Sequence, residues 1–456
     1  MTSSSDLPRG LLAVALIAVL ASLAGIGTRA SYGARTTGDE PHYLLTAISL
    51  WEDQDLDVSD EIAERRYEPF SEVGLNRQSR PLEGGRLVSP HDPLLPLLLA
   101  PGMAIAGWAG AKVTLALLAG VLAAAVLWLA VRRFDAPLLP AAIVTGIGAA
   151  SAPLAVYGTQ VYPELPAALA VVAAVAAATS RRGGAARIAG AGLAITALPW
   201  LSVKYAPVAA ALAAVIAVTW WRNGDRAGTA WLGGVLAASG ALFVAAHLAW
   251  YGGWTPYAVG DHFVTGELGV VGFAPDFAGR SRRLIGLLVG REFGLAAWQP
   301  AWLAALPALG ALAARRPRGW AFLAVPLGAG WLNATFVALT MHGWWWPGRQ
   351  VVVVAPLVVV AVALWAATSR RRLVATAVLG GVGVFAYGYL TIEALAGRLT
   401  VVVDFFETSN PLYRAWSVLL PDYRHLSAGT WVLHALWIAV AVCGVSWGSR
   451  AATRRP

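Results

Sequence analysis

The chain has 456 residues, of which 58% are hydrophobic and 13% are charged, and its formal net charge at pH 7 is +9. So few polar groups cannot cover a soluble globule, and the composition therefore indicates a polytopic membrane protein. The basic residues form short clusters between apolar runs, which is typical of cytoplasmic loops and argues against nucleic-acid binding. The single cysteine, Cys443, excludes an intramolecular disulfide and a cysteine metal site.

Twelve apolar runs are read as helices that cross about 30 Å of hydrocarbon. They predict an all-α fold of about 12 transmembrane helices, with both chain termini on the same side of the membrane. The runs lie near residues 10–27, 111–131, 137–156, 161–179, 186–203, 205–221, 229–250, 293–314, 319–341, 350–368, 372–390 and 429–447.

The loops between these runs separate into two chemical kinds. Short basic loops fall on the side of the termini, and the large loops 28–92, 261–292 and 391–428 carry most of the carboxylates on the other side. The positive-inside rule then predicts a plasma-membrane protein with cytoplasmic termini and extracytoplasmic large loops. The basic clusters are Arg132-Arg133, Arg181-Arg182, Arg315-Arg316, Arg370-Arg371-Arg372 and the tail residues Arg450, Arg454 and Arg455.

Two shorter apolar segments do not fit a full crossing. Pro93 to Trp108 has sixteen residues and three prolines, and a crossing there would turn the later basic loops outward. We therefore expect a re-entrant or interfacial segment. Leu284 to Gly290 is expected to form a loop helix that leads into the following span.

The first outer loop carries adjacent carboxylates, Asp39 and Glu40, just beyond the first apolar run. Pro41 suits the first turn of a helix, and apolar residues then recur at helical spacing as far as Trp51. We expect this helix, from His42 to about Trp51, to lie against the membrane with its apolar side down. A carboxylate at its positive end stays ionised, as a general base should, although both could merely cap the helix.

Several segments on the predicted outer face resemble the GT-C glycosyltransferase superfamily, the membrane enzymes that use polyprenyl-phosphate sugars, including protein mannosyltransferases and aminoarabinose transferases. The resemblance extends to about residue 368 and lies in the order and shared sidedness of the motifs. These motifs are Gly38-Asp39-Glu40-Pro41-His42-Tyr43-Leu44, Ser89-Pro90-His91-Asp92-Pro93-Leu94-Leu95-Pro96, Tyr162-Pro163-Glu164, Trp200-Leu201-Ser202-Val203-Lys204-Tyr205, Arg291-Glu292-Phe293-Gly294-Leu295 and Gly343-Trp344-Trp345-Trp346-Pro347-Gly348-Arg349.

The resemblance implies an inverting transfer of a sugar from a polyprenyl-phosphate donor to an extracytoplasmic acceptor. Either Asp39 or Glu40 would be the general base, and the family pattern favours Asp39. The cations expected to hold the donor phosphate are Lys204, Arg291 and Arg349. Further candidates for the site are His42, Tyr43, His91, Asp92, Glu164, His342 and Trp345.

The chain is expected to divide into a GT-C-like catalytic core, residues 1–368, and a C-terminal transmembrane region, residues 369–456, whose outer loop could close over the acceptor. The expected partners are membrane lipids, the lipid-linked sugar donor and a protein, polysaccharide or glycolipid acceptor. No cofactor is required if cations neutralise the phosphate. His91-Asp92 and His342 raise the weaker alternative of a divalent metal.

The other class of function considered is a multi-pass transporter or flippase for a lipid-linked or polar solute. Twelve spans suit it, but transporters place polar sites near the bilayer midplane. The spans here hold few ionisable residues, chiefly His247 and His434. The proposed site residues also have simpler explanations, because Lys204 could extend to the headgroups, Arg349 could belong to an aromatic belt, and Arg291 could pair with Glu292.

Overall fold

The computed structural model describes residues 6–180, 184–263, 266–272 and 274–453. The basic pair Arg181-Arg182 and the tail residues Arg454 and Arg455 lie outside the described residues. Within the described ranges the secondary structure is helical, without strands and with three isolated β-bridges. The predicted all-α class is therefore confirmed.

A helix stands at each of the twelve predicted apolar runs. Eight helical stretches among the described residues are long and apolar enough to cross a membrane, and α5, α7 and α8 are shorter apolar helices. The twelve helices are α1 (Asp6–Ala24), α4 (Leu94–Arg133), α5 (Leu138–Ala149), α7 (Glu164–Ala178), α8 (Ala185–Leu201), α9 (Ala206–Arg222), α10 (Arg226–Tyr251), α14 (Ala305–Arg315), α15 (Trp320–Leu332), α16 (Ala355–Ala366), α17 (Arg370–Leu395) and α19 (Ala428–Thr453).

Short helices fill the connections. The α-helical ones are α2 (Glu40–Glu52), α3 (Ser59–Ala63), α6 (Leu154–Tyr157), α11 (Phe277–Arg280), α12 (Arg283–Val289), α13 (Leu295–Trp298) and α18 (Pro411–Ser417). The remaining single turns are η1 (Glu83–Gly85), η2 (Val203–Tyr205), η3 (Pro256–Val259), η4 (Asp261–Phe263), η5 (Glu267–Val271), η6 (Pro300–Ala304), the π-helical η7 (Asn333–Val337), η8 (Arg349–Val354) and η9 (Phe405–Glu407).

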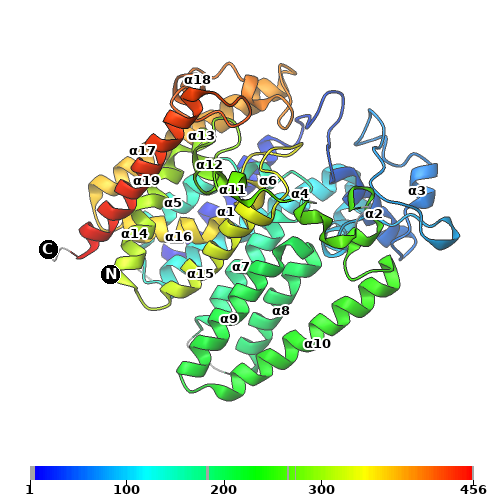
Figure 1. Ribbon diagram of the computed structural model, residues 1–456, viewed down its shortest axis with the longest axis horizontal. Helices are drawn as coiled ribbons and strands as arrows, with labels where there is room; N and C mark the ends of the chain where they lie inside the picture. Colours follow the sequence, from blue (N-terminus) through cyan, green and yellow to red (C-terminus); the bar gives the residue numbers. More distant parts are fainter. Residues whose placement is uncertain (1–5, 181–183, 264–265, 273, 454–456) are drawn as a thin grey trace.

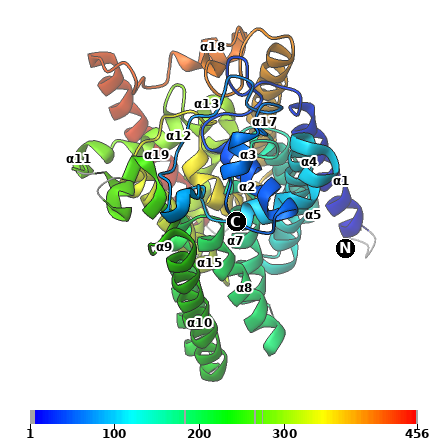
Figure 2. The same ribbon diagram turned by 90° about the vertical axis from the view of Figure 1, so that its right-hand side faces the viewer.

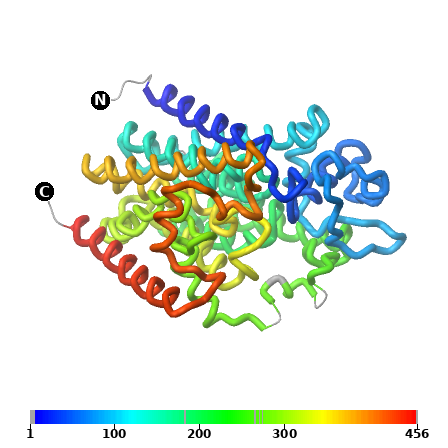
Figure 3. The backbone as a smooth tube through the Cα atoms, turned by 90° about the horizontal axis from the view of Figure 1, so that it is seen from above, coloured from blue at the N-terminus to red at the C-terminus, as the bar shows by residue number. Residues whose placement is uncertain are grey.

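The long helices form one bundle with distinct ends. The start of α1 and the end of α19 lie at the same end, on the left in Figures 1 and 3, whereas α2 and α3 lie at the opposite end. Helices α8, α9 and α10 extend below the rest in Figure 1, and α10 projects farthest in Figure 2. The first outer loop therefore sits at the end of the bundle away from both termini.

Helix α4 contains the short apolar segment that was expected not to cross. Its backbone leaves the helical conformation at Ala106 and at Gly107, where φ is 58°. Because of this bend, a side chain at Gly110 would collide with the backbone of Gly102. The segment before the bend thus folds against the one after it, and only the later part continues the predicted span from 111 to 131.

Helix α2 differs from the expected surface helix. Every residue from Glu40 to Ser49 is buried, and the helix packs against α4. The expectation that its apolar side faces the membrane is therefore wrong, because α4 and the loops around α2 cover its surface. The predicted loop helix near Leu284 is present as α12.

Candidate active site

Asp39 lies in the turn that leads into α2. The preceding residue, Gly38, has φ 58°, and a Cβ there would lie 2.8 Å from the Tyr162 hydroxyl oxygen, so glycine suits this turn. Asp39 occupies the N-cap position but makes no side-chain capping hydrogen bond. Instead its Oδ2 accepts from Arg349 Nη2 at 2.7 Å, and its Oδ1 accepts from Gln78 Nε2 at 3.3 Å. Simple helix capping does not account for this carboxylate.

Arg349 links the first outer loop to α7. It begins η8 after Gly348, and its Nε donates to Glu164 Oε1 at 2.9 Å while Nη2 binds Asp39. The guanidinium carbon lies 4.0 Å from the centre of the Tyr162 ring and 4.9 Å from that of Trp345. Two aromatic rings and two carboxylates therefore fix the orientation of this cation.

Glu164 and Lys204 complete a network of four charges. Lys204 Nζ donates to Glu164 Oε1 at 2.5 Å, and the Lys204 carbonyl accepts from Asn333 Nδ2 at 3.0 Å. Glu164 is fully buried, and its second oxygen has no hydrogen-bond partner within the described part of the chain. Buried charges are costly unless they are paired. The two acids and two bases of this network neutralise each other.

A second set of polar rings surrounds Asp39. His91 Nε2 lies 2.9 Å from Gln78 Oε1, and the Tyr43 ring stacks on His91 at 4.6 Å. Burial lowers the pKa of His91 to about 4, so its ring is neutral at pH 7. The nearby His42 binds the carbonyl oxygen of Asn76 at 2.9 Å and does not reach Asp39.

Several of these side chains line a cavity of about 160 Å³. The space is bounded by residues from the first outer loop, from η2 and from η8, together with the loop that carries Tyr257. The residues that give it its chemistry are Asp39, Tyr43, Gln78, His91, Lys204 and Arg349. Of the two adjacent carboxylates at the start of α2, it is Asp39 that faces this cavity.

Asp39 and Glu40 differ in environment. Burial alone would raise the pKa of Asp39, but the Arg349 guanidinium and other nearby cations hold it well below its usual range. Burial raises the pKa of Glu40 to about 7, and its oxygens accept from the backbone N–H groups of Val161 and Thr37 at 2.8 and 3.2 Å. Glu40 therefore fastens the loop to the turn before α7, whereas Asp39 faces the cavity.

Two predicted site residues lie elsewhere. Arg291 binds Asp422 at 3.1 Å and two backbone carbonyls of the C-terminal outer loop, so the structure does not bring it to the cavity. The expected pair between Arg291 and Glu292 is not formed either, because Glu292 binds Arg424 at 2.6 Å. His342 packs against Phe293, with ring centres 4.9 Å apart.

Asp92 is buried beside the cavity without lining it. Its oxygens accept from the backbone N–H of Val203 at 2.9 Å and from His247 Nε2 at 3.1 Å. Asp92 thereby positions η2, which carries Lys204. The candidates for the weaker metal alternative have separate contacts: His91 binds Gln78, Asp92 binds His247, and His342 packs against Phe293.

Sequence reasoning missed several residues of this region. Gln78 contacts both Asp39 and His91. Its loop is held by backbone hydrogen bonds with Val259 and Asp261, and no local sequence pattern predicts this pairing. Lys112 had a usable signal, since Lys112 and Lys204 are the only lysines in the sequence. Lys112 lies in an apolar run, where a cation is costly, and it donates to the Arg35 carbonyl at 3.1 Å.

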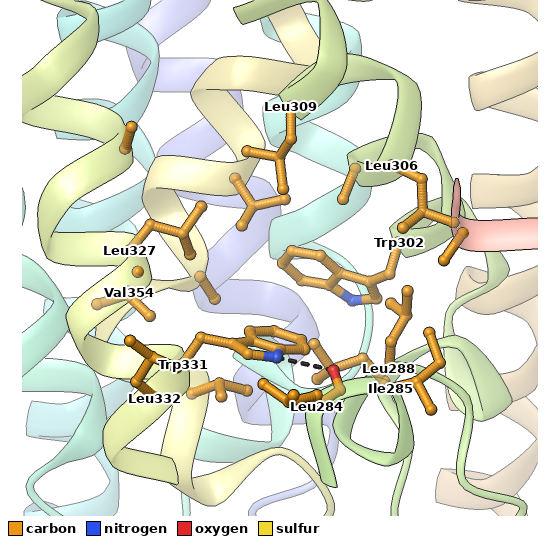
Figure 4. A pocket seen from close by; sticks show the side chains of 18 of the residues that line it. Leu284, Ile285, Leu288, Trp302, Leu306, Leu309, Leu327, Trp331, Leu332 and Val354 are labelled. Atoms are coloured by element: carbon orange, nitrogen blue, oxygen red, sulfur yellow. Dashed lines mark hydrogen bonds between the residues drawn. The ribbon is translucent and has the colours of Figure 1, made fainter. Parts of the chain in front are cut away.

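A second, apolar cavity of about 880 Å³ lies among α12, α14, α15, α16 and α19. Figure 4 shows Trp302, Trp331 and the surrounding leucines pointing into it, with Trp331 Nε1 donating to the Leu284 carbonyl at 2.9 Å. Helix η8 carries Arg349 at its start and presents Val354 to this cavity. The charged network and the apolar cavity therefore share a structural element.

Comparison with known proteins identifies the fold. No protein-family model matches the sequence, and no curated protein matches it. ArnT from Cupriavidus metallidurans is similar over 99% of this chain and 77% of its own chain. Its structure bound to undecaprenyl phosphate has 14% sequence identity and a TM-score of 0.50. Its apo structure has 16% sequence identity and a TM-score of 0.51. The apo oligosaccharyltransferase of Archaeoglobus fulgidus has 13% sequence identity and a TM-score of 0.45, over 96% of this chain and 60% of its own chain. The chain is thus an all-α polytopic membrane protein with a fold similar to that of ArnT.

Proposed function

We propose that this protein is a membrane glycosyltransferase that moves a sugar from a polyprenyl-phosphate donor to an acceptor on the extracytoplasmic face. The observation that carries the proposal is the buried network of Asp39, Arg349, Glu164 and Lys204 at a small cavity. A base and two phosphate-binding cations are what such a transfer needs. The undecaprenyl phosphate bound to ArnT supports a lipid-linked donor.

The donor would use both cavities. Its phosphate would lie between Lys204 and Arg349, and its apolar chain would enter the cavity walled by Trp302 and Trp331. Arg349 can bind phosphate oxygens in a bidentate manner, whereas Lys204 supplies a compact charge. Two elements connect the cavities. Helix η8 carries Arg349 at its start and presents Val354 to the apolar cavity. Asn333, directly after α15, donates to the Lys204 carbonyl. The sugar would then project toward Asp39.

The reaction would proceed by direct displacement. Asp39 takes the proton of an acceptor hydroxyl while that oxygen attacks the sugar C1 from the face opposite the phosphate. The bond from C1 to the phosphate oxygen breaks, and polyprenyl phosphate leaves with the bonding electrons. Lys204 and Arg349 stabilise its increasing negative charge, and the configuration at C1 inverts.

Donor binding would also activate the base. In the free protein Arg349 holds the pKa of Asp39 below its usual range, which makes Asp39 a weak base. A phosphate that shares Arg349 weakens this pair and adds negative charge, and both effects raise the basicity of Asp39. The cavity therefore acquires an effective base only when a donor is present.

The distribution of charge supports a cytoplasmic position for both termini and an extracytoplasmic position for the cavity. Arg132, Arg133 and Arg370 lie at the ends or starts of long helices, away from the first outer loop. A protein, a polysaccharide or a glycolipid could each supply the acceptor hydroxyl. No metal is needed for the proposed step, because Lys204 and Arg349 carry the charge.

The test is turnover by the purified protein in nanodiscs with a panel of polyprenyl-phosphate sugars and candidate acceptors. Mass spectrometry would follow the released polyprenyl phosphate. Release that depends on both donor and acceptor is the expected result. If no donor is consumed and the folded protein instead moves lipids or solutes across vesicle membranes, the transporter alternative replaces this proposal.

A further inference from the structure

The acidic stretch of the first outer loop contains carboxylates with and without protein partners. Glu52 binds Arg66 through two hydrogen bonds of 2.7 and 3.0 Å, and Asp57 accepts from the backbone N–H groups of Ser59 and Leu87. Asp55 likewise accepts from the Ser49 hydroxyl. These residues fasten the loop internally, and their charge or hydrogen-bonding capacity is already used.

Three other acids in this stretch converge without a cation. Asp53, at the C-cap of α2, and Asp60 and Glu61, in α3, bring one carboxylate oxygen each within 4.8 Å of one another. None of the three forms an ion pair within the described residues, and the neighbouring Arg66 is paired with Glu52. Three like charges so close together repel unless a proton or a cation lies between them.

Glu61 gives a second, independent indication of a missing ligand. Its exposed fraction is 2%, and neither carboxylate oxygen has a hydrogen-bond donor within the described chain. A buried carboxylate without donors is costly.

We propose that Asp53, Asp60 and Glu61 form a Ca²⁺ site that joins the end of α2 to α3. Oxygens on opposite sides of a Ca²⁺ ion are about 4.6 to 5.2 Å apart, given ligand distances of about 2.3 to 2.6 Å, so all three carboxylates can reach one ion. Asp53 and Asp60 are exposed, which leaves a path for the ion and room for water ligands. The site lies at the opposite end of α2 from Asp39.

Calcium would stabilise the first outer loop rather than take part in sugar transfer. By replacing a shared proton it would neutralise the repulsion and hold α3 against α2, which carries Asp39 at its start. Three carboxylates with water correspond to an affinity in the range of extracellular modules, with a Kd of about 10⁻⁴ to 10⁻³ M. This inference does not depend on the proposed function.

The test is thermal unfolding of the chelator-treated, full-length protein in nanodiscs during titration with CaCl₂. A Tm that rises with Ca²⁺ is expected for the wild type, because a ligand that binds the folded state stabilises it. Asp53→Asn and Asp60→Asn change exposed side chains and should weaken the Ca²⁺ response at least tenfold. Glu83→Gln removes an exposed acid of the same loop and should retain the wild-type response.

Glu61→Gln distinguishes a cation from a shared proton, because glutamine resembles the protonated acid. The calcium account predicts that this variant no longer responds to Ca²⁺ while remaining folded. A wild-type Tm that is insensitive to Ca²⁺ would overturn the proposal and leave the acids sharing a proton. A full response in both Asp53→Asn and Asp60→Asn, or an equal loss in Glu83→Gln, would also overturn it.

Discussion

Two regions of this protein hold their acids and bases in different ways. In the network around Arg349 the exposed fractions of the side chains are 9% for Arg349, 23% for Asp39 and 0% for Glu164. In the contacts between residues 291–292 and the C-terminal outer loop they are 34% for Arg291 and 39% for Arg424, with 16% for Asp422 and 12% for Glu292. The first region joins elements far apart in sequence around a cavity. The second mainly fastens two loops to each other.

The difference teaches that two cations with similar sequence surroundings can have very different environments in the fold. Arg291 and Arg349 look equivalent in the sequence, because each lies just before a predicted apolar run and close to aromatic residues. The groups that the two arginines bind in the structure distinguish them. Arg349 contacts two carboxylates and two aromatic rings, whereas Arg291 contacts one carboxylate and two backbone carbonyls. Each prediction below pairs a residue of one region with a matched residue of the other.

The largest expected effect is on turnover. Asp39→Asn keeps the size of the side chain but removes the base, and general-base catalysis contributes about 10²- to 10⁴-fold. We expect kcat to fall at least about 100-fold in the polyprenyl-phosphate release assay, with the protein still folded in the membrane. Asp422→Asn, which removes the partner of Arg291, should keep a turnover close to that of the wild type. Equal effects in the two variants would remove the distinction between the regions.

The next effect is on stability. Arg349→Met leaves Asp39 without its cation and Glu164 with only Lys204, and breaking a buried ion pair costs about 3 to 5 kcal/mol. Arg424→Met breaks a more exposed pair and should cost less than about 1 kcal/mol. Chemical unfolding in detergent micelles measures both. A similar loss of unfolding free energy in the two variants would contradict the contrast in burial.

Acidification should reveal the buried histidine. The pKa of His91 is about 4 in the folded protein, below the ordinary value of about 6.5, so the unfolded chain binds more protons between these values. The contribution of neutral His91 to the unfolding free energy is fully present above about pH 6.5. About 2 to 3 kcal/mol of it is lost as the pH falls toward 4. His91→Gln should reduce this dependence, whereas the exposed His425→Gln should not. The test is to measure the unfolding free energy of the wild type and of both variants at pH 7 and pH 4.5.

The smallest expected effect is on donor affinity. Lys204→Met removes one of the two phosphate-binding cations, and a hydrogen bond to a charged group is worth about 1.5 to 3 kcal/mol. We expect the KM for the lipid donor to rise about tenfold or more, with a smaller change in the KM for the acceptor. Arg291→Met should leave the donor KM unchanged. A larger change in Arg291→Met than in Lys204→Met would move the phosphate site to the C-terminal loop.

Much of this arrangement could be predicted from the sequence because it depends on local signals. Apolar runs located the long helices, and the motifs around Asp39, Glu164, Lys204 and Arg349 indicated residues that the structure brings together. The burial of α2 could not be predicted, because its amphipathic spacing suits a membrane surface as well as a protein interior. The packing of α4 against α2 is what places this helix in the protein interior.

The differences between the predicted and observed positions of the site residues have the same origin. The sequence does not indicate which loops converge, so Arg291 and His342 were grouped with Arg349, whereas in the structure they pack away from the cavity that Arg349 lines. Gln78 was missed because its position depends on backbone pairing with Asp261, which lies far along the chain. Lys112 could have been found, since a lone lysine in an apolar run requires a partner or a polar cavity.

The most direct test of the central claim is the position of the lipid phosphate in an electron cryo-microscopy structure of the protein in nanodiscs with added polyprenyl phosphate. The account predicts a phosphate within hydrogen-bonding distance of Lys204 and Arg349, with the lipid chain in the cavity lined by Trp302 and Trp331. A phosphate bound at Arg291, or a lipid chain outside that cavity, would contradict it.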